Sequence, residues 1–166
     1  MIKRRYLTQD EIKNSCLEIA RQLFKDEWHP DYIVGITRGG LWSSVMLSHF
    51  LGINMFTLDV RLRDGNELSF ESNTWMANDA YKGKKILIVD DINDTGETLQ
   101  WIVDDWTKTV WESDAKWQEV WHKSVRFACT VDNLPSKFEI DYSGIEINKE
   151  EDPAWIVFPH EGWWEI

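Results

Sequence analysis

The sequence predicts an α/β fold in which helices flank both faces of a mostly parallel, twisted sheet. Two apolar runs, at 32–36 and 86–89, show no polar alternation, as expected of strands buried on both faces. Helical patterns separate the expected strands, and that order favours parallel strands joined by helical crossovers. The 166 residues predict one domain, with a core over about 8–131 and a smaller C-terminal part over about 132–166.

The first half of the chain supplies the clearest elements. Thr8 and Glu11 form a capping box, and the apolar spacing behind it predicts a helix over about 9–25. An apolar helix is expected over 41–51, and Gly52 ends it in the position that glycine favours. The other expected elements are strands at 54–60 and 124–131, a long helix over about 96–122, and apolar segments at 138–147 and 155–159.

The charge of the chain argues against several classes of partner. Its formal net charge is −11, which disfavours duplex DNA and anionic membranes because binding to either needs basic patches. No apolar run approaches the roughly 18 residues of a membrane span, and the first residues lack the apolar stretch of a signal peptide. Cys16 and Cys129 lie in apolar runs and are expected to be buried and unpaired. The sequence thus predicts a cytoplasmic protein without nucleic-acid or membrane partners.

The segment 86–98 carries the most specific chemistry. A predicted buried strand ends in two adjacent carboxylates, and a turn then places two hydroxyls and a glycine where a helix begins. Ligands of open α/β sheets bind beyond the carboxyl ends of strands, and a helix N-terminus suits a phosphate. Carboxylates accept hydrogen bonds from a ribose diol, directly or through Mg²⁺. The residues in question are Asp90, Asp91, Thr95, Gly96 and Thr98.

This segment resembles the motif by which type I phosphoribosyltransferases bind 5-phosphoribosyl-1-pyrophosphate (PRPP). The motif is four apolar residues, two acidic residues, two variable residues and then Asp-Thr-Gly-x-Thr, and all of it is present. The alternative is a capped strand–turn–helix without a ligand. The resemblance implies that Asp90 and Asp91 hold the ribose hydroxyls and Mg²⁺, and that Asp94 is the general base. It also implies a 5′-phosphate site formed by Thr95, Gly96, the backbone of Glu97, and Thr98.

A second segment is similar to the pyrophosphate loop of the purine branch of that family. It consists of Thr37, Arg38, Gly39 and Gly40, and follows the expected strand 32–36. The resemblance implies that Arg38 and the loop amides contact pyrophosphate, and that the Thr37–Arg38 peptide is cis. The alternative is an ordinary turn with an exposed arginine.

The polar stretch 61–82 fits neither a helix nor a strand, and loops of this length are usually functional or disordered. It takes the place of the mobile flap that covers PRPP in the family, where closure excludes water. Arg61 and Arg63 are its only arginines and are expected either to reach pyrophosphate or to stay solvated.

Near the C-terminus, Asp141 and Tyr142 are followed by the run from Asp152 to Pro159. These residues are similar to the tail of bacterial xanthine–guanine phosphoribosyltransferases, which implies that 132–166 forms a base-binding hood. The resemblance implies that Trp155 stacks on a purine and that the backbone of Ile156 reads its edge; the alternative places Trp155 in the core. The family's purine-reading lysine is missing after the expected strand 124–131, where the chain has Asp132 and Asn133. A carboxylate accepts hydrogen bonds and would favour an amino group, so the sequence leaves the base open.

The chain has eleven tryptophans, and five of them lie in 101–121. If 96–122 is one helix, most of these face the sheet, whereas Trp101 and Trp111 fall off that face. They would then mark an oligomer interface, or simply belong to an amphipathic helix. His122 would end the helix as a favourable C-terminal charge.

Together these features predict a Mg²⁺-dependent enzyme that transfers the phosphoribosyl group of PRPP to a nucleobase, with a purine favoured, as a homodimer or homotetramer. A non-catalytic regulator that senses PRPP or a nucleotide on the same fold is the alternative. A phosphoacceptor receiver domain also has an acidic pair after a strand. There the pair follows the first strand, whereas here two strands precede it and Asp-Thr-Gly-x-Thr follows at once.

Overall fold

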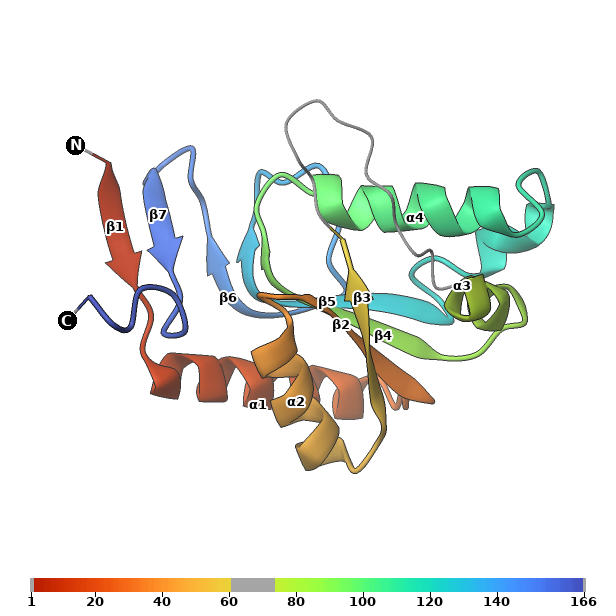
Figure 1. Ribbon diagram of the computed structural model, residues 1–166, viewed down its shortest axis with the longest axis horizontal. Helices are drawn as coiled ribbons and strands as arrows, with labels where there is room; N and C mark the ends of the chain where they lie inside the picture. The colour runs from red at the N-terminus through yellow and green to blue at the C-terminus, as the bar shows by residue number, and fades with distance from the viewer. Residues whose placement is uncertain (1, 61–73, 166) are drawn as a thin grey trace.

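The computed structural model describes residues 2–60 and 74–165 (Figure 1). Its main sheet has five strands in the order β3-β2-β4-β5-β6, and every neighbouring pair is parallel. The strands are β2 (Tyr32–Thr37), β3 (Met55–Asp59), β4 (Ile86–Asn93), β5 (Val125–Asn133) and β6 (Tyr142–Ile147). The predicted α/β architecture is therefore confirmed.

Helices cover both faces of this sheet (Figure 1). The helices α1 (Gln9–Lys25) and α2 (Leu41–Leu51) lie on one face, and α3 (Thr74–Tyr81) and α4 (Glu97–Thr109) lie on the other. Alternate residues of β4 serve the two cores: Ile86 and Ile88 pack beneath α4, whereas Leu87 and Val89 pack toward α1 and α2. Because both faces are buried, the strand has no polar alternation, as the sequence indicated.

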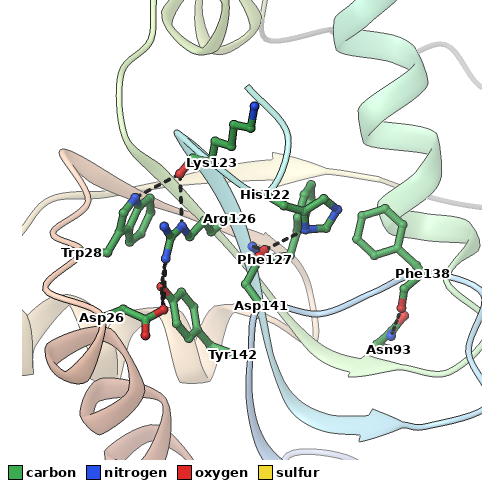
Figure 2. Close-up of polar contacts among 10 residues, drawn as sticks. All are labelled: Asp26, Trp28, Asn93, His122, Lys123, Arg126, Phe127, Phe138, Asp141 and Tyr142. Carbon is green, nitrogen blue, oxygen red and sulfur yellow. Dashed lines mark hydrogen bonds and ion pairs between the residues drawn. The ribbon is translucent and has the colours of Figure 1, made fainter. Parts of the chain in front are cut away.

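The first helix begins and ends on side-chain contacts that the sequence encodes. The backbone N–H of Glu11 donates to Thr8 Oγ1 at 3.1 Å, and the N–H of Thr8 donates to Glu11 Oε2 at 2.8 Å, which completes the capping box. Beyond the last turn, Asp26 accepts from Arg126 Nη1 at 3.2 Å and from the hydroxyl of Tyr142 at 3.1 Å (Figure 2). The Arg126 guanidinium also lies 4.9 Å from the ring centroid of Trp28. These contacts fix the end of α1 against β5 and β6.

The prediction of one helix over 96–122 is wrong for the second half of that range. The helix α4 ends at Thr109, Val110 is extended, and Trp111 has a φ of +52°. A short 3-10 helix, Ala115–Glu119, follows, capped by the Asp114 side chain.

The aromatic residues of this segment fold back on the core instead of continuing one helical face. Trp106 and Trp117 are buried, and the Trp117 ring stacks on Trp121 with centroids 5.3 Å apart. Trp101 packs partly against the same core, so of the two off-face tryptophans only Trp111 is strongly exposed. His122 does not end a helix; it pairs with Asp141 at 3.1 Å (Figure 2).

Two further elements differ from the sequence prediction. Residues 74–81 of the expected flap form α3, because Met76, Ala77 and Ala80 bury one helical face; residues 61–73, with Arg61 and Arg63, lie outside the described residues. A strand that no pattern indicated, β1 (Lys3–Tyr6), pairs in parallel with β7 (Ala154–Val157).

Both cysteines are buried and free, as expected. Among the described residues, no helix is long and apolar enough to cross a membrane.

Candidate active site

The strand order creates a switch point between β2 and β4. The chain leaves β2 through α2 and goes to the edge strand β3, whereas it leaves β4 through α4 and goes to β5 on the opposite side. The two connections therefore diverge above the carboxyl ends of neighbouring strands. Open α/β sheets bind ligands in such a crevice. Both motifs found in the sequence lie at this point.

A cavity of about 950 Å³ opens there. The predicted site residues that line it are Thr37, Arg38, Gly39, Asp91 and Thr98. Its lining also includes residues that no sequence motif marked, namely Asp59, Val60, His160, Glu161, Gly162 and Trp164. The C-terminal turn after β7 thus forms one wall of the cavity.

The loop after β2 packs directly against the carboxylates after β4. The Thr37–Arg38 peptide is cis, as the resemblance implied. A Cβ atom on Gly40 would overlap the carbonyl oxygen of Val89, and one on Gly39 would overlap the carboxylate of Asp91. Both glycines are therefore needed for the space they leave, and the loop amides lie close to the acidic pair.

The acidic pair is held in a largely buried position. Burial raises the pKa of Asp90 well above its usual value, and the charge of Asp91 raises it further. Burial also raises the pKa of Asp91, although hydrogen bonds and the nearby His160 act in the opposite direction. Two adjacent carboxylates in such a place are stabilised by a bound cation or by hydrogen-bond donors of a ligand.

The loop that is expected to bind a phosphate leads directly into α4, whose N-cap is Gly96. Gly96 has a φ of +85°, and a Cβ atom there would lie 2.5 Å from Cβ of Phe138, so a side chain is excluded on both grounds. Thr95 Oγ1 accepts from the N–H of Glu97 at 3.4 Å. Thr98 lines the large cavity, whereas Thr95, Gly96 and Glu97 line a different hollow of about 400 Å³, so the expected phosphate residues do not all line one cavity.

Asn93, at a variable position of the motif, holds this loop in place. It is 1% exposed, and its Nδ2 donates to the carbonyl of Phe138 at 2.9 Å (Figure 2). The same Nδ2 donates to Asp132 Oδ1 at 2.8 Å. Its Oδ1 accepts from Ser136 Oγ at 2.9 Å. Asn93 therefore fastens the turn after β5 against the phosphate loop, and it also occupies an oxygen of Asp132.

Asp94 lies beside the turn after β5 and the turn after β6. Its Oδ1 accepts from Asn133 Nδ2 at 3.3 Å, and its Oδ2 accepts from Lys149 Nζ at 2.7 Å. Lys149 Nζ also lies 5.9 Å from the ring centroid of Trp155, which is 58% exposed and so is not a core residue. Ile156 is buried in β7. Sequence reasoning missed Lys149, because it stands 55 residues after Asp94 on a different connection.

The main sheet is parallel, and its switch point carries an acidic pair, a glycine loop and a helix N-terminus. This arrangement is typical of α/β proteins that bind phosphorylated ligands. The comparisons with known proteins narrow this class. The family model described as "Phosphoribosyl transferase domain" matches residues 5–161, so the chain belongs to the phosphoribosyltransferase family.

Several solved structures share the fold. A purine phosphoribosyltransferase from Pyrococcus horikoshii is 27% identical, with a TM-score of 0.69 and coverage of 95% of this chain and 94% of that chain. A xanthine-guanine-hypoxanthine phosphoribosyltransferase from Helicobacter pylori is 18% identical, with a TM-score of 0.64 and coverage of 99% and 97%. A hypoxanthine-guanine phosphoribosyltransferase from Bacillus anthracis is 16% identical, with a TM-score of 0.59 and coverage of 90% and 85%.

Proposed function

We propose that this protein transfers the 5-phosphoribosyl group from PRPP to a purine base and releases pyrophosphate. The observation that carries the proposal is the convergence of the Thr37–Gly40 loop and the acidic pair on one cavity at the β2–β4 switch point. PRPP needs hydrogen-bond donors for its pyrophosphate and acceptors for its ribose hydroxyls. The loop supplies the donors, and the acidic pair supplies the acceptors. The similarity to a purine phosphoribosyltransferase over nearly the whole chain supports a purine as acceptor.

In this proposal, each part of the site has a separate task. Asp90 and Asp91 accept hydrogen bonds from the ribose hydroxyls, while Arg38 and the loop amides stabilise the negative charge that develops on departing pyrophosphate. The first turn of α4 holds the 5′-phosphate. Asp94 takes the proton from the attacking ring nitrogen of the base, which Trp155 holds by stacking.

The acidic pair fits Mg²⁺. Carboxylate oxygens are its usual protein ligands, and it is commonly bound by one or two carboxylates together with oxygens of a phosphorylated substrate. Among the described residues, no cluster of three or more His, Cys, Asp or Glu side chains could form an all-protein cage. We therefore assign Asp90 and Asp91 as the residues that would hold Mg²⁺ beside PRPP. When bound, the ion would neutralise part of the pyrophosphate charge.

The test is pyrophosphate release from PRPP and Mg²⁺, with guanine, xanthine, hypoxanthine, adenine and uracil offered separately. We expect release with a purine, and its loss when Mg²⁺ is chelated. Release with uracil alone would overturn the assignment of a purine. PRPP binding by calorimetry without release with any base would instead support the regulatory alternative, and absence of both would contradict a PRPP site.

A further inference from the structure

His160 lies in the turn that follows β7, in the wall of the large cavity. The backbone N–H of Glu161 donates to the carbonyl of Phe158 at 2.9 Å, and the N–H of Phe158 donates to Glu161 Oε2 at 2.9 Å. Phe158 is buried, so these two hydrogen bonds close the turn on a residue of the core. The turn therefore fixes the backbone of His160.

Two aromatic rings hold the imidazole of His160 in position. It stacks on the ring of Phe158, with centroids 5.6 Å apart and an interplanar angle of 24°. The ring of Trp42 lies 5.7 Å from the imidazole and is tilted by 51°. Trp42 is the second residue of α2, which begins directly after the Thr37–Gly40 loop. The imidazole is consequently packed next to the loop that we propose binds pyrophosphate.

The packing of the imidazole uses its ring faces and leaves its nitrogens available to a ligand. In the described part of the chain, no group forms a hydrogen bond with either nitrogen of His160. Neither nitrogen is buried, since Ser124 Oγ is the one buried side-chain nitrogen or oxygen without a partner among these residues. An imidazole carries at least one N–H donor in either of its charge states. His160 thus offers a donor to the cavity that it lines.

The charges around the cavity leave room for a further donor to a pyrophosphate. Among the lining residues that the structure describes, Arg38 is the one arginine or lysine, and the carboxylates are those of Asp59, Asp91 and Glu161. A pyrophosphate brings more negative charge to this place, which the carboxylates disfavour. An N–H that donates to a charged phosphate oxygen forms a stronger hydrogen bond than one between neutral groups, so it offsets part of this repulsion.

We propose that His160 is a pyrophosphate-binding residue, which donates an imidazole N–H to the pyrophosphate group of PRPP from the turn after β7. Arg38 and the amides of the loop after β2 donate to the same group, so two separate elements hold it. This inference rests on the proposed PRPP site, and it adds a residue that neither sequence motif contains. The alternative is an imidazole that only packs against Trp42 and Phe158.

The experiment separates the hydrogen-bond donor of His160 from its packing. His160→Phe keeps a flat ring against Trp42 and Phe158 but removes both nitrogens, whereas His160→Gln supplies an amide that can donate. His29→Phe is the matched control, because His29 is exposed and does not line the cavity. Calorimetry with Mg²⁺ measures the affinity of each variant for PRPP, inorganic pyrophosphate and ribose 5-phosphate. Pyrophosphate release from PRPP with the purine bases is followed in parallel.

His160→Phe should weaken the binding of PRPP and of pyrophosphate by about 10- to 100-fold, the usual effect of losing a hydrogen bond to a charged group. The affinity for ribose 5-phosphate should stay unchanged, because this ligand carries no pyrophosphate. His160→Gln should recover part of the loss, and His29→Phe should match the wild type.

Two results would overturn the inference alone. Equal pyrophosphate affinity in His160→Phe and the wild type would leave His160 as a packing residue. An equal loss for ribose 5-phosphate and PRPP would show that the variant disturbs the whole site. A loss confined to PRPP and pyrophosphate, in a protein that transfers to no base, would contradict the proposed function but keep the inference. Absence of PRPP and pyrophosphate binding by the wild type would overturn both.

Discussion

The backbone of Gly39 lies directly against the side chain of Asp91. A Cβ atom on Gly39 would overlap Oδ2 and Cγ of that carboxylate and would lie 2.9 Å from Oδ1. The glycine is thus required by the space between the two loops rather than by its backbone angles. The loop after β2 and the acidic pair after β4 are consequently packed closely against each other.

Gly39→Ala should therefore damage the site more than the fold. The new methyl group must displace the Asp91 carboxylate, and overpacking of this kind typically costs about 1–3 kcal/mol. We expect PRPP affinity, measured by calorimetry with Mg²⁺, to fall by about tenfold or more. Gly83→Ala is the control: its position is open but has a φ of +88°, so it should lower the melting temperature and leave PRPP affinity unchanged. Equal PRPP affinity in Gly39→Ala and the wild type would contradict this account.

Replacement of Trp155 should separate base binding from PRPP binding. Stacking of a base on an aromatic ring is worth about 1–3 kcal/mol, so Trp155→Leu should raise the KM for the purine by about 5- to 150-fold. PRPP affinity should not change. Trp111→Leu serves as the control, because Trp111 is 73% exposed and follows the far end of α4. A normal purine KM in Trp155→Leu would show that the exposed ring is not the platform.

The sequence predicts the parts of the site that are local in the chain. Asp90, Asp91 and the first turn of α4 lie within one strand–turn–helix, and the buried run before them specifies where that strand ends. Lys149 could not be found in this way. Its contact with Asp94 is a hydrogen bond across 55 residues, which exists only when the turn after β6 lies beside the loop after β4.

The difference between local contacts and contacts of distant residues also explains where the fold prediction was wrong. The strand β1 is exposed along its whole length, so it has no burial pattern, and it forms because β7 offers backbone partners. The helix α4 ends early because Val110 is extended and Trp111 adopts a left-handed conformation, while apolar spacing continues beyond them. Ser113 and Asp114, both of which favour turns, were the one local indication of this break.

The pair formed by His122 and Asp141 should make stability depend on pH. Asp141 Oδ2 lies 3.1 Å from His122 Nδ1, and this hydrogen bond raises the pKa of the histidine above its ordinary value of 6.5 (Figure 2). The charged pair therefore contributes its full stabilisation below pH 6.5, and loses it as the pH rises through the folded-state pKa. His122→Asn keeps a residue type that tolerates the φ of +60°.

The difference in free energy of unfolding between the wild type and His122→Asn should be largest at acidic pH. It should shrink as the pH increases, when measured by urea denaturation between about pH 5.5 and 8.5. Asp141→Asn and the double variant complete the cycle and isolate the contribution of the pair. A difference that stays constant, or that grows with pH, would contradict the assigned direction of the pKa shift.

Asp94→Asn tests whether this carboxylate takes the proton from the base. An asparagine preserves the shape of the side chain and its contact with Asn133, but it cannot accept a proton from the ring nitrogen. We expect kcat to fall by about 10²- to 10⁴-fold, the usual contribution of a general base, while PRPP affinity stays nearly unchanged. Asp152→Asn is the matched control, since Asp152 also accepts from a lysine at 2.7 Å but lies outside the site. Near-normal turnover in Asp94→Asn would show that Asp94 does not take part in proton transfer. A loss of PRPP affinity as large as the loss of kcat would assign Asp94 to PRPP binding instead.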